Sequence, residues 1–307
     1  MPVYYFKDSR GNVGDDLNAL ILRHFFDFDK CSKASYTLVG IGTLINNRLP
    51  LSREFIFFTT GYGYQKPPNF NDTRVSAIGL RGPMTLAKLR PFLQENESNI
   101  PLIDGAYLTP DLIPKNATPE PNRVGLIPHV DSMQIGRWEE IAKRGQFRLI
   151  DPRWEPSKFI GALTSCSTVI TEAMHGAILA DAYRVPWAGF AAHSHINTDK
   201  WHDWSESLSI PLHINSVSPV FKGDEGLPFM SRVKNIIKRT AQKTKLYNNN
   251  WTLPPVARSN NKDMERTLDE LKQIAAREKY QLSDYAIVQE KLVHLRARID
   301  EFNASKG

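Results

Sequence analysis

Short apolar runs alternate with amphipathic stretches along most of the chain. The runs occupy residues 3–6, 35–39, 55–60, 75–79, 124–128, 147–150, 168–171 and 187–190. Several are followed by a polar loop and then by apolar residues spaced three or four apart, which is the period of a helix. Continuous apolar runs of this length are typical of strands buried on both faces of a parallel sheet. The pattern therefore predicts an α/β fold.

The same pattern divides the chain into two halves and a tail. Residues 114–123 carry three prolines and few apolar side chains, which indicates a linker. We therefore predict two Rossmann-like domains that face a cleft, residues 1–115 and 120–250. A helical tail over residues 256–307 follows them.

The sequence predicts two helical segments near the end of the chain but does not decide what each of them packs against. Residues 229–245 carry apolar side chains on one side and six basic side chains on the rest, so this helix either lies against an anionic membrane surface or is only solvated. In the tail, apolar residues recur at steps of three and four from Leu268 to Phe302, which describes one helical face. That face packs either on the body of the protein or on a second subunit, in a homodimer through the C-terminal helix.

Polar residues gather where the predicted strands end. Residues 8–18 follow the first strand and contain Gly14 and Asp15 at the start of a helix. A glycine-bearing loop before a helix forms a pocket the size of a phosphate or a sugar, although here both residues could serve only as turn and helix cap. Arg81, just after a strand, either grips a carboxylate or phosphate bidentately or forms a structural ion pair.

The stretch 168–189 is the centre of this organisation. Its strand ends in Glu172 and His175, three residues apart, and a helix of small residues follows. Ligands of open α/β sheets bind at this kind of strand edge. The pair is therefore placed for proton transfer, and the alternative is a solvated turn whose histidine caps the helix.

Composition and net charge limit the classes of partner that the protein can bind. The chain has 307 residues and a net charge of +6, which favours an anionic partner. It shows no nucleic-acid-binding motif, so we expect none of that class. There is no secretory pattern at the N-terminus and no apolar run of about 18 residues, and the two cysteines lie in apolar surroundings. We therefore expect a cytoplasmic protein, with the inner face of the cytoplasmic membrane as the alternative location.

Several motifs together resemble the polysaccharide pyruvyltransferase family, in its bacterial exopolysaccharide branch. They are residues 12–18 (NVGDDLN), 40–43 (GIGT), 80–83 (LRGP), 126–129 (LIPH), 172–176 (EAMHG) and 200–204 (KWHDW). The resemblance runs from about residue 3 to residue 214 and does not cover the tail. One position departs from it, because many members carry Arg where this chain has Ala173.

The resemblance implies a fold like that of the GT-B glycosyltransferases, with the acceptor on the first domain and the donor on the second. It also implies transfer of pyruvate from phosphoenolpyruvate to two hydroxyls of one sugar, which makes a cyclic ketal. That reaction needs no redox cofactor, and the sequence shows no ligand set that demands a metal. The sugar acceptor and whether it is carried on a lipid stay open.

The chemistry assigns roles to the residues of these motifs. His175 would protonate the methylene carbon of phosphoenolpyruvate, and Glu172 or Asp15 would deprotonate the sugar hydroxyl. The cation that replaces the arginine missing at Ala173 would be Arg81 or, failing that, His129. The full set of expected substrate-binding residues is Asn12, Gly14, Asn18, Gly42, Thr43, Arg81, His129, Met174, Gly176 and His195.

Two other functions fit the same pattern. The first is a GT-B glycosyltransferase that uses a nucleotide sugar, which would share the architecture. The second is a relative without catalytic activity that only binds glycans, which Ala173 supports.

Overall fold

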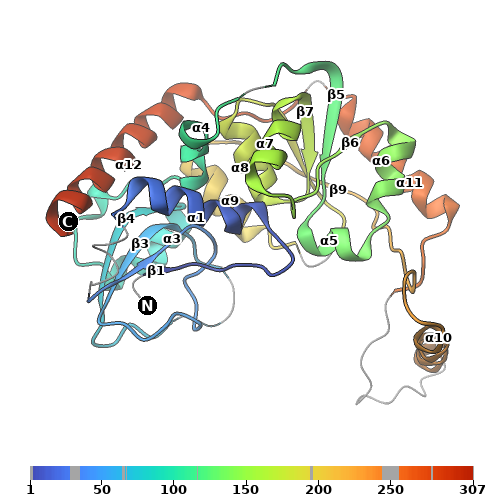
Figure 1. The fold of residues 1–307 in the computed structure, drawn as a ribbon, viewed down its shortest axis with the longest axis horizontal. Helices are drawn as coiled ribbons and strands as arrows, with labels where there is room; N and C mark the ends of the chain where they lie inside the picture. The colour runs from blue at the N-terminus through green and yellow to red at the C-terminus, as the bar shows by residue number, and fades with distance from the viewer. Residues whose placement is uncertain are drawn as a thin grey trace.

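The fold is α/β and is built on two parallel sheets (Figure 1). The computed structural model describes residues 3–27, 35–63, 66, 68–115, 117–193, 196–243, 256–277 and 279–306. The first sheet has the order β1-β2-β3-β4. Its strands are β1 (Val3–Tyr4), β2 (Thr37–Val39), β3 (Glu54–Thr60) and β4 (Arg74–Leu80). The sequence pattern thus predicted these strands and their parallel arrangement.

The second sheet has the order β6-β5-β7-β8-β9, and all its neighbours pair in parallel. Its strands are β5 (Glu120–Ile127), β6 (Arg148–Leu149), β7 (Cys166–Thr171), β8 (Trp187–Ala191) and β9 (Ile214–Ser216). The strand β9 was not predicted. The strand β5 begins inside the proposed linker, because Glu120 pairs with Cys166 before an irregularity in the register.

Helices connect and cover the strands. They are α1 (Val13–Phe25), α3 (Pro83–Leu89), α4 (Thr109–Leu112), α5 (Val130–Ile135), α6 (Trp138–Gly145), α7 (Pro156–Thr164), α8 (Met174–Ala182) and α9 (Asp199–Ser207). Three short 3₁₀ turns are η1 (Arg90–Phe92), η2 (Glu97–Asn99) and η3 (Gly105–Leu108).

A short break separates two helices of the second half. The helix α5 ends at Ile135 and α6 begins at Trp138. The indole of Trp138 turns back and donates from Nε1 to the Ser132 carbonyl at 3.0 Å. A Cβ on Gly136 would lie 2.3 Å from that nitrogen, so the break requires glycine there.

The aromatic segment 200–204 packs inward. Trp201 and Trp204 are both 0% exposed, and each ring packs at a tilt against Trp187 of β8. They therefore build the core rather than a sugar-stacking surface. Helix α9, which carries them, packs against α3 of the first half of the chain.

The tail packs on the body of the protein. Helix α11 (Asn261–Ala275) contacts α6, and α12 (Tyr285–Lys306) returns to β4 of the first sheet (Figure 1). Arg298 on α12 donates from Nη2 to the Ala77 carbonyl of β4 at 3.1 Å. Of the two expected partners for the apolar face of the tail, the body is confirmed, and a homodimer stays a prediction. No helix in the described part of the chain is long and apolar enough to cross a membrane.

We expect Leu295→Ala to destabilise the protein by about 2–5 kcal/mol, as for other large-to-small core changes. Leu295 is 0% exposed on α12, and its Cδ1 lies where a Cβ on Gly79 of β4 would be only 3.0 Å away. Urea unfolding measures the change. The matched control is Val293→Ala on the same helix, at a position 65% exposed; equal losses for the two variants would contradict the packing of α12 on the first sheet.

Candidate active site

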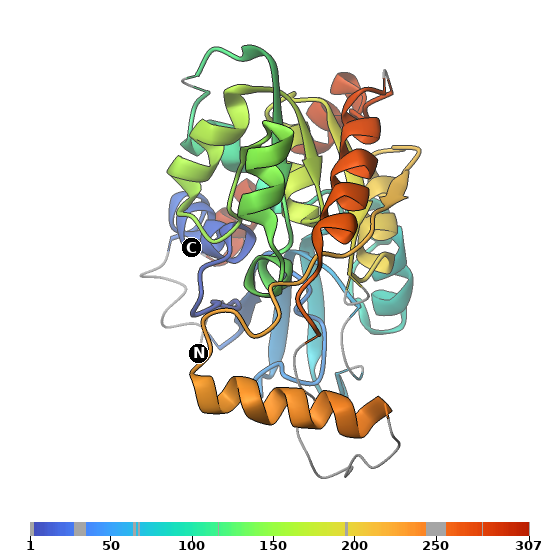
Figure 2. The same ribbon diagram turned by 90° about the vertical axis from the view of Figure 1, so that its right-hand side faces the viewer.

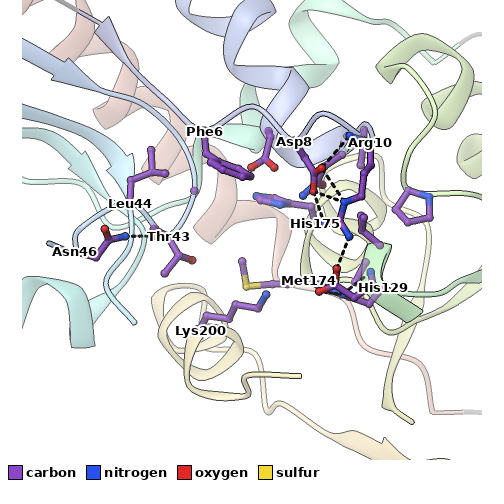
Figure 3. Close-up of a pocket in the computed structure, with 18 of the residues that line it drawn as sticks. Phe6, Asp8, Arg10, Thr43, Leu44, Asn46, His129, Met174, His175 and Lys200 are labelled. Atoms are coloured by element: carbon purple, nitrogen blue, oxygen red, sulfur yellow. Dashed lines mark hydrogen bonds and ion pairs between the residues drawn. The ribbon is translucent and has the colours of Figure 1, made fainter. Parts of the chain in front are cut away.

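A pocket of about 340 Å³ lies where the carboxyl ends of the two sheets meet (Figure 3). The first half contributes the loop after β1, the start of α1 and the segment after β2. The second half contributes the ends of β5 and β7, the first residues of α8, and Lys200 on α9. Strand ends and helix N-termini from both halves therefore face one space.

His175, at the second position of α8, is the centre of the pocket. Its Nε2 is buried without a hydrogen-bond partner, and so is Oδ2 of Asp104, 4.0 Å away. The other edge of the ring packs against Gly14 of α1, where an added Cβ would lie 1.9 Å from Nδ1. Gly14 and Asp104 from the first half therefore hold a histidine from the second.

The ionisable groups around His175 have shifted pKa values. Burial, aided by the positive charges of Lys200 and Arg81, lowers the pKa of His175 to about 3. Burial, with the negative charges of Asp8 and Asp16, raises the pKa of Asp15 to about 7. Burial also raises the pKa of Asp104 to about 6. At neutral pH the pocket therefore holds a neutral imidazole, and Asp15 keeps its proton to a much higher pH than an ordinary aspartate.

The start of α8 is suited to an anion. Its N-cap residue is Ala173, and no side chain caps the first amides of this helix. Uncapped amides at a helix N-terminus carry partial positive charge into the pocket. The Nζ of Lys200 points to the same place, toward His175 and Met174 (Figure 3).

A second cation spans the mouth of the pocket. Arg10, in the loop after β1, donates from Nη2 to Asp8 at 2.6 Å and from Nη1 to Asp131 of α5 at 2.8 Å. One guanidinium therefore ties the loop of the first half to a helix of the second. These ion pairs raise the pKa of Arg10 above its ordinary value, chiefly through the bond to Asp8.

Seven of the predicted site residues line the pocket, namely Asn12, Asp15, Gly42, Thr43, His129, Met174 and His175. Five lie directly behind its lining: Gly14, Asn18, Arg81, Glu172 and Gly176. His195 lies outside the described residues. The predicted residues thus lie together at one set of strand ends, some in the lining of the pocket and some behind it.

Glu172 belongs to the layer behind the pocket. It is 0% exposed, and its carboxylate accepts from the backbone amides of His129 at 3.1 Å and Ala192 at 3.0 Å. Burial alone would raise its pKa, but hydrogen bonds from His193, Ser132 and the His129 amide lower it on balance. This carboxylate is therefore ionised, and it joins the ends of β5, β7 and β8. It does not line the pocket.

Arg81 is also held behind the pocket. Its Nε donates to Asp203 at 3.1 Å, its Nη1 to Thr43 Oγ1 at 2.9 Å and its Nη2 to the Tyr62 carbonyl at 3.1 Å. Of the two roles left open by the sequence, the geometry supports the structural ion pair and not a grip on a ligand. Since Asp203 lies on α9 and Thr43 lines the pocket, Arg81 supports both Lys200 and the pocket wall.

Asn18 and Gly176 have similar supporting roles. The Asn18 side chain accepts from the Ile41 amide at 2.7 Å and donates to the Ile41 carbonyl at 3.0 Å, which clamps α1 to the segment that carries Gly42. A Cβ on Gly176 would lie 2.4 Å from Thr171 Oγ1. Glycine there lets α8 start close to the end of β7.

Sequence reasoning missed Arg10, Lys200, Asp104 and Asp131. Arg10 lies inside the predicted loop 8–18, and Lys200 lies inside the motif 200–204, so both segments carried a signal. The direction of these side chains depends on how the two halves pack, which no local pattern contains. The described residues hold no group of three or more His, Cys, Asp or Glu side chains suited to a metal ion.

Comparison with known proteins places these elements in a family. The model of the family described as polysaccharide pyruvyl transferase matches residues 73–194, which include β4, Arg81, Asp104, His129 and the start of α8. The succinoglycan biosynthesis protein ExoV of Rhizobium meliloti is 32% identical over 212 residues, which are 68% of this chain and 66% of that protein. The chain belongs to the polysaccharide pyruvyltransferase family. No solved structure matches it.

We expect the imidazole of His175 to stay neutral from pH 8 down to about pH 4, because its pKa is lowered to about 3. Titration by NMR of histidine-labelled protein measures this, with His175→Asn to assign the signal. An ordinary histidine titrates near ~6.5, and the urea-unfolded protein supplies that reference. A midpoint for His175 near the unfolded value would contradict the burial of the ring.

Proposed function

We propose that the protein transfers pyruvate from phosphoenolpyruvate to two hydroxyls of a sugar in an exopolysaccharide or its precursor. The observation that carries this is the meeting of His175, Asp15 and the uncapped start of α8 in one pocket with Lys200. A donor with one carboxylate and one phosphate needs cationic positions, and the α8 amides with Lys200 would supply one of them. Arg10, whose guanidinium is held by Asp8 and Asp131, would fix the loop beside the pocket. Membership of the family and the relative in succinoglycan biosynthesis support the same activity.

In this proposal the two halves act as two Rossmann-like domains of the GT-B kind. Residues 1–115 would hold the sugar acceptor and residues 120–250 the donor. The lining of the pocket by both halves supports that division. A cytoplasmic location belongs to the proposal as well, since the donor is an intracellular metabolite.

The reaction is one addition and one substitution at the same carbon. In the addition, the methylene carbon of phosphoenolpyruvate gains a proton, the central carbon is attacked by a sugar hydroxyl, and that hydroxyl loses its proton to a base. In the substitution, the bond from that carbon to phosphate breaks, a second hydroxyl of the sugar takes its place and passes its proton to the departing phosphate, and the cyclic ketal closes. The protein must therefore supply one acid and one base at opposite sides of the donor carbon.

The resting charge states favour Asp15 as the acid and His175 as the base. Asp15, whose pKa is raised to about 7, can carry a proton at neutral pH, whereas His175, whose pKa is lowered to about 3, is neutral. The negative charge of a bound donor would raise the basicity of this imidazole and let it accept a proton. Environments that push two pKa values apart assign the acid and the base. This exchanges the roles expected from ordinary pKa values, in which the histidine donates. Asp104 would then hold Nε2 of the imidazolium that forms after proton transfer.

The test is a comparison of ligands followed by an assay of transfer. We expect phosphoenolpyruvate to raise the thermal midpoint, because a ligand that binds only the folded state stabilises it, and nucleoside diphosphates to leave it unchanged. Lys200→Ala should weaken phosphoenolpyruvate binding about tenfold, as expected for loss of a charged contact. Lys272→Ala, at an exposed position of α11, is the matched control.

Three outcomes would overturn the proposal. A rise of the thermal midpoint with a nucleoside diphosphate, and none with phosphoenolpyruvate, would favour a glycosyltransferase. Binding of sugars without release of phosphate, with lipid-linked and free acceptors alike, would favour a glycan-binding protein. Transfer that survives His175→Ala would remove His175 from the mechanism.

We expect Asp15→Asn to lower kcat by about 10²–10⁴-fold, which is the usual loss of a general acid, and to stabilise the fold. The folded protein binds a proton at Asp15 below about pH 7, whereas the unfolded chain binds it only near pH 3.8. The free energy of unfolding of the wild type therefore decreases as pH rises from about 4 to about 7. The variant has no carboxyl at this position, so its free energy of unfolding does not decrease for this reason. The difference in free energy of unfolding between the variant and the wild type should grow over that range and level off at up to about 4 kcal/mol.

Urea unfolding at several pH values measures this gain. The control is Asp269→Asn, an exposed aspartate of α11 that does not line the pocket and does not act on Asp15. Its pH profile should follow the wild type. A variant at Asp15 that loses activity without gaining stability above pH 7 would contradict the raised pKa.

A further inference from the structure

The helix α10 (Phe229–Lys243) presents its apolar side to solvent. Phe229 is 76% exposed, Met230 64%, Ile236 57% and Ile237 56%. At 100° per residue these four side chains fall on one side of the helix. Their exposure reverses the usual arrangement, in which a surface helix buries its apolar side against the core.

The polar side of α10 is the one that is fastened. Asp224, in the preceding loop, accepts from Asn235 Nδ2 at 2.7 Å and from the guanidinium of Arg239. The same loop is tied to the body, because Phe221 and Ser259 exchange hydrogen bonds of 2.9 and 3.0 Å. The ties therefore hold the helix with its apolar side turned outward.

The helix also stands off the two sheets. Figure 1 shows α10 below the second sheet, and Figure 2 shows its whole length along the lower edge of the molecule. An outward apolar side on a projecting element is a surface prepared for a partner.

Charge identifies the kind of partner. The 15 residues of α10 include no acidic side chain and five basic ones, namely Arg232, Lys234, Lys238, Arg239 and Lys243. On the helical projection Lys234 and Lys238 flank the apolar side at one border, and Arg232 flanks it at the other. A second copy of this helix would bring like charges together, so the charge favours an anionic surface.

We propose that α10 docks the protein on the surface of an anionic lipid bilayer, with its four exposed apolar side chains in the acyl boundary and its basic borders at the headgroups. A helix with an apolar side bordered by Lys and Arg binds this interface in-plane. The proposal goes beyond pyruvyl transfer and does not depend on it. Combined with that activity, it places the pocket beside acceptors carried on lipids.

The experiment is co-sedimentation of the full chain with vesicles of phosphatidylcholine alone or with phosphatidylglycerol added. We expect partitioning only into the anionic vesicles and a loss of it at high salt. The variant Ile236→Asp with Ile237→Asp should bind at least about tenfold more weakly, because two apolar side chains no longer enter the boundary. The variant Lys234→Glu with Lys238→Glu should lose about fivefold or more for each charge.

Matched controls separate docking from general effects. Leu51→Asp changes a fully exposed apolar residue of the first half, and Lys262→Glu with Lys272→Glu changes two exposed lysines of α11; all three changes should leave partitioning as in the wild type. Circular dichroism and thermal midpoints check that every variant is folded.

Two results would overturn the proposal. One is equal sedimentation of the wild type and the α10 variants with anionic vesicles. The other is a dimer in solution that the Ile236 and Ile237 changes abolish while wild-type protein ignores vesicles, since the apolar side would then join copies of the chain. Failure of pyruvyl transfer would not affect either measurement.

Discussion

The pocket depends on the contact between Gly14 and His175. A single Cβ at Gly14 would lie 1.9 Å from the imidazole, so the absence of a side chain there lets the N-termini of α1 and α8 meet. The first belongs to the half with β1 and the second to the half with β7. Asp15 follows Gly14 directly, and the open amides of α8 surround His175. One close approach thus sets the positions of the proposed acid, the proposed base and the open amides of α8 together.

The same closeness has an electrostatic cost. Packing the two halves this tightly removes water from His175, Asp15 and Asp104, and each of these groups shifts toward its neutral form. An anionic donor changes the balance, since its charge beside the imidazole favours protonation. The burial that shifts these three pKa values therefore also suits the pocket to a negatively charged ligand.

The alternation of apolar runs predicted the α/β class and eight of the nine strands that the described residues form, because burial on both faces leaves a clear pattern. It also predicted the strand ends that form the pocket. It could not say which side chains turn inward. Glu172 and Arg81 have the chemistry of site residues, yet both satisfy backbone and side-chain partners behind the lining. For Arg81 that distinction depends on how α9 packs against α3, a contact between residues more than a hundred positions apart. For Glu172 it depends on the amides at the ends of β5 and β8.

Many members of the family carry an arginine where this chain has Ala173, and Lys200 can supply the positive charge that is missing there. An arginine at the N-cap of α8 would place its charge beside His175 from the same segment. With alanine there, the amides of α8 stay open, and a lysine from α9 points to the same region. Arg81 holds α9 in place through Asp203, while that carboxylate also accepts from the Thr85 amide at 3.0 Å. The charge at the anion site is thus a property of the packing between halves. A cation missing from a motif can be supplied by a helix that the motif does not contain.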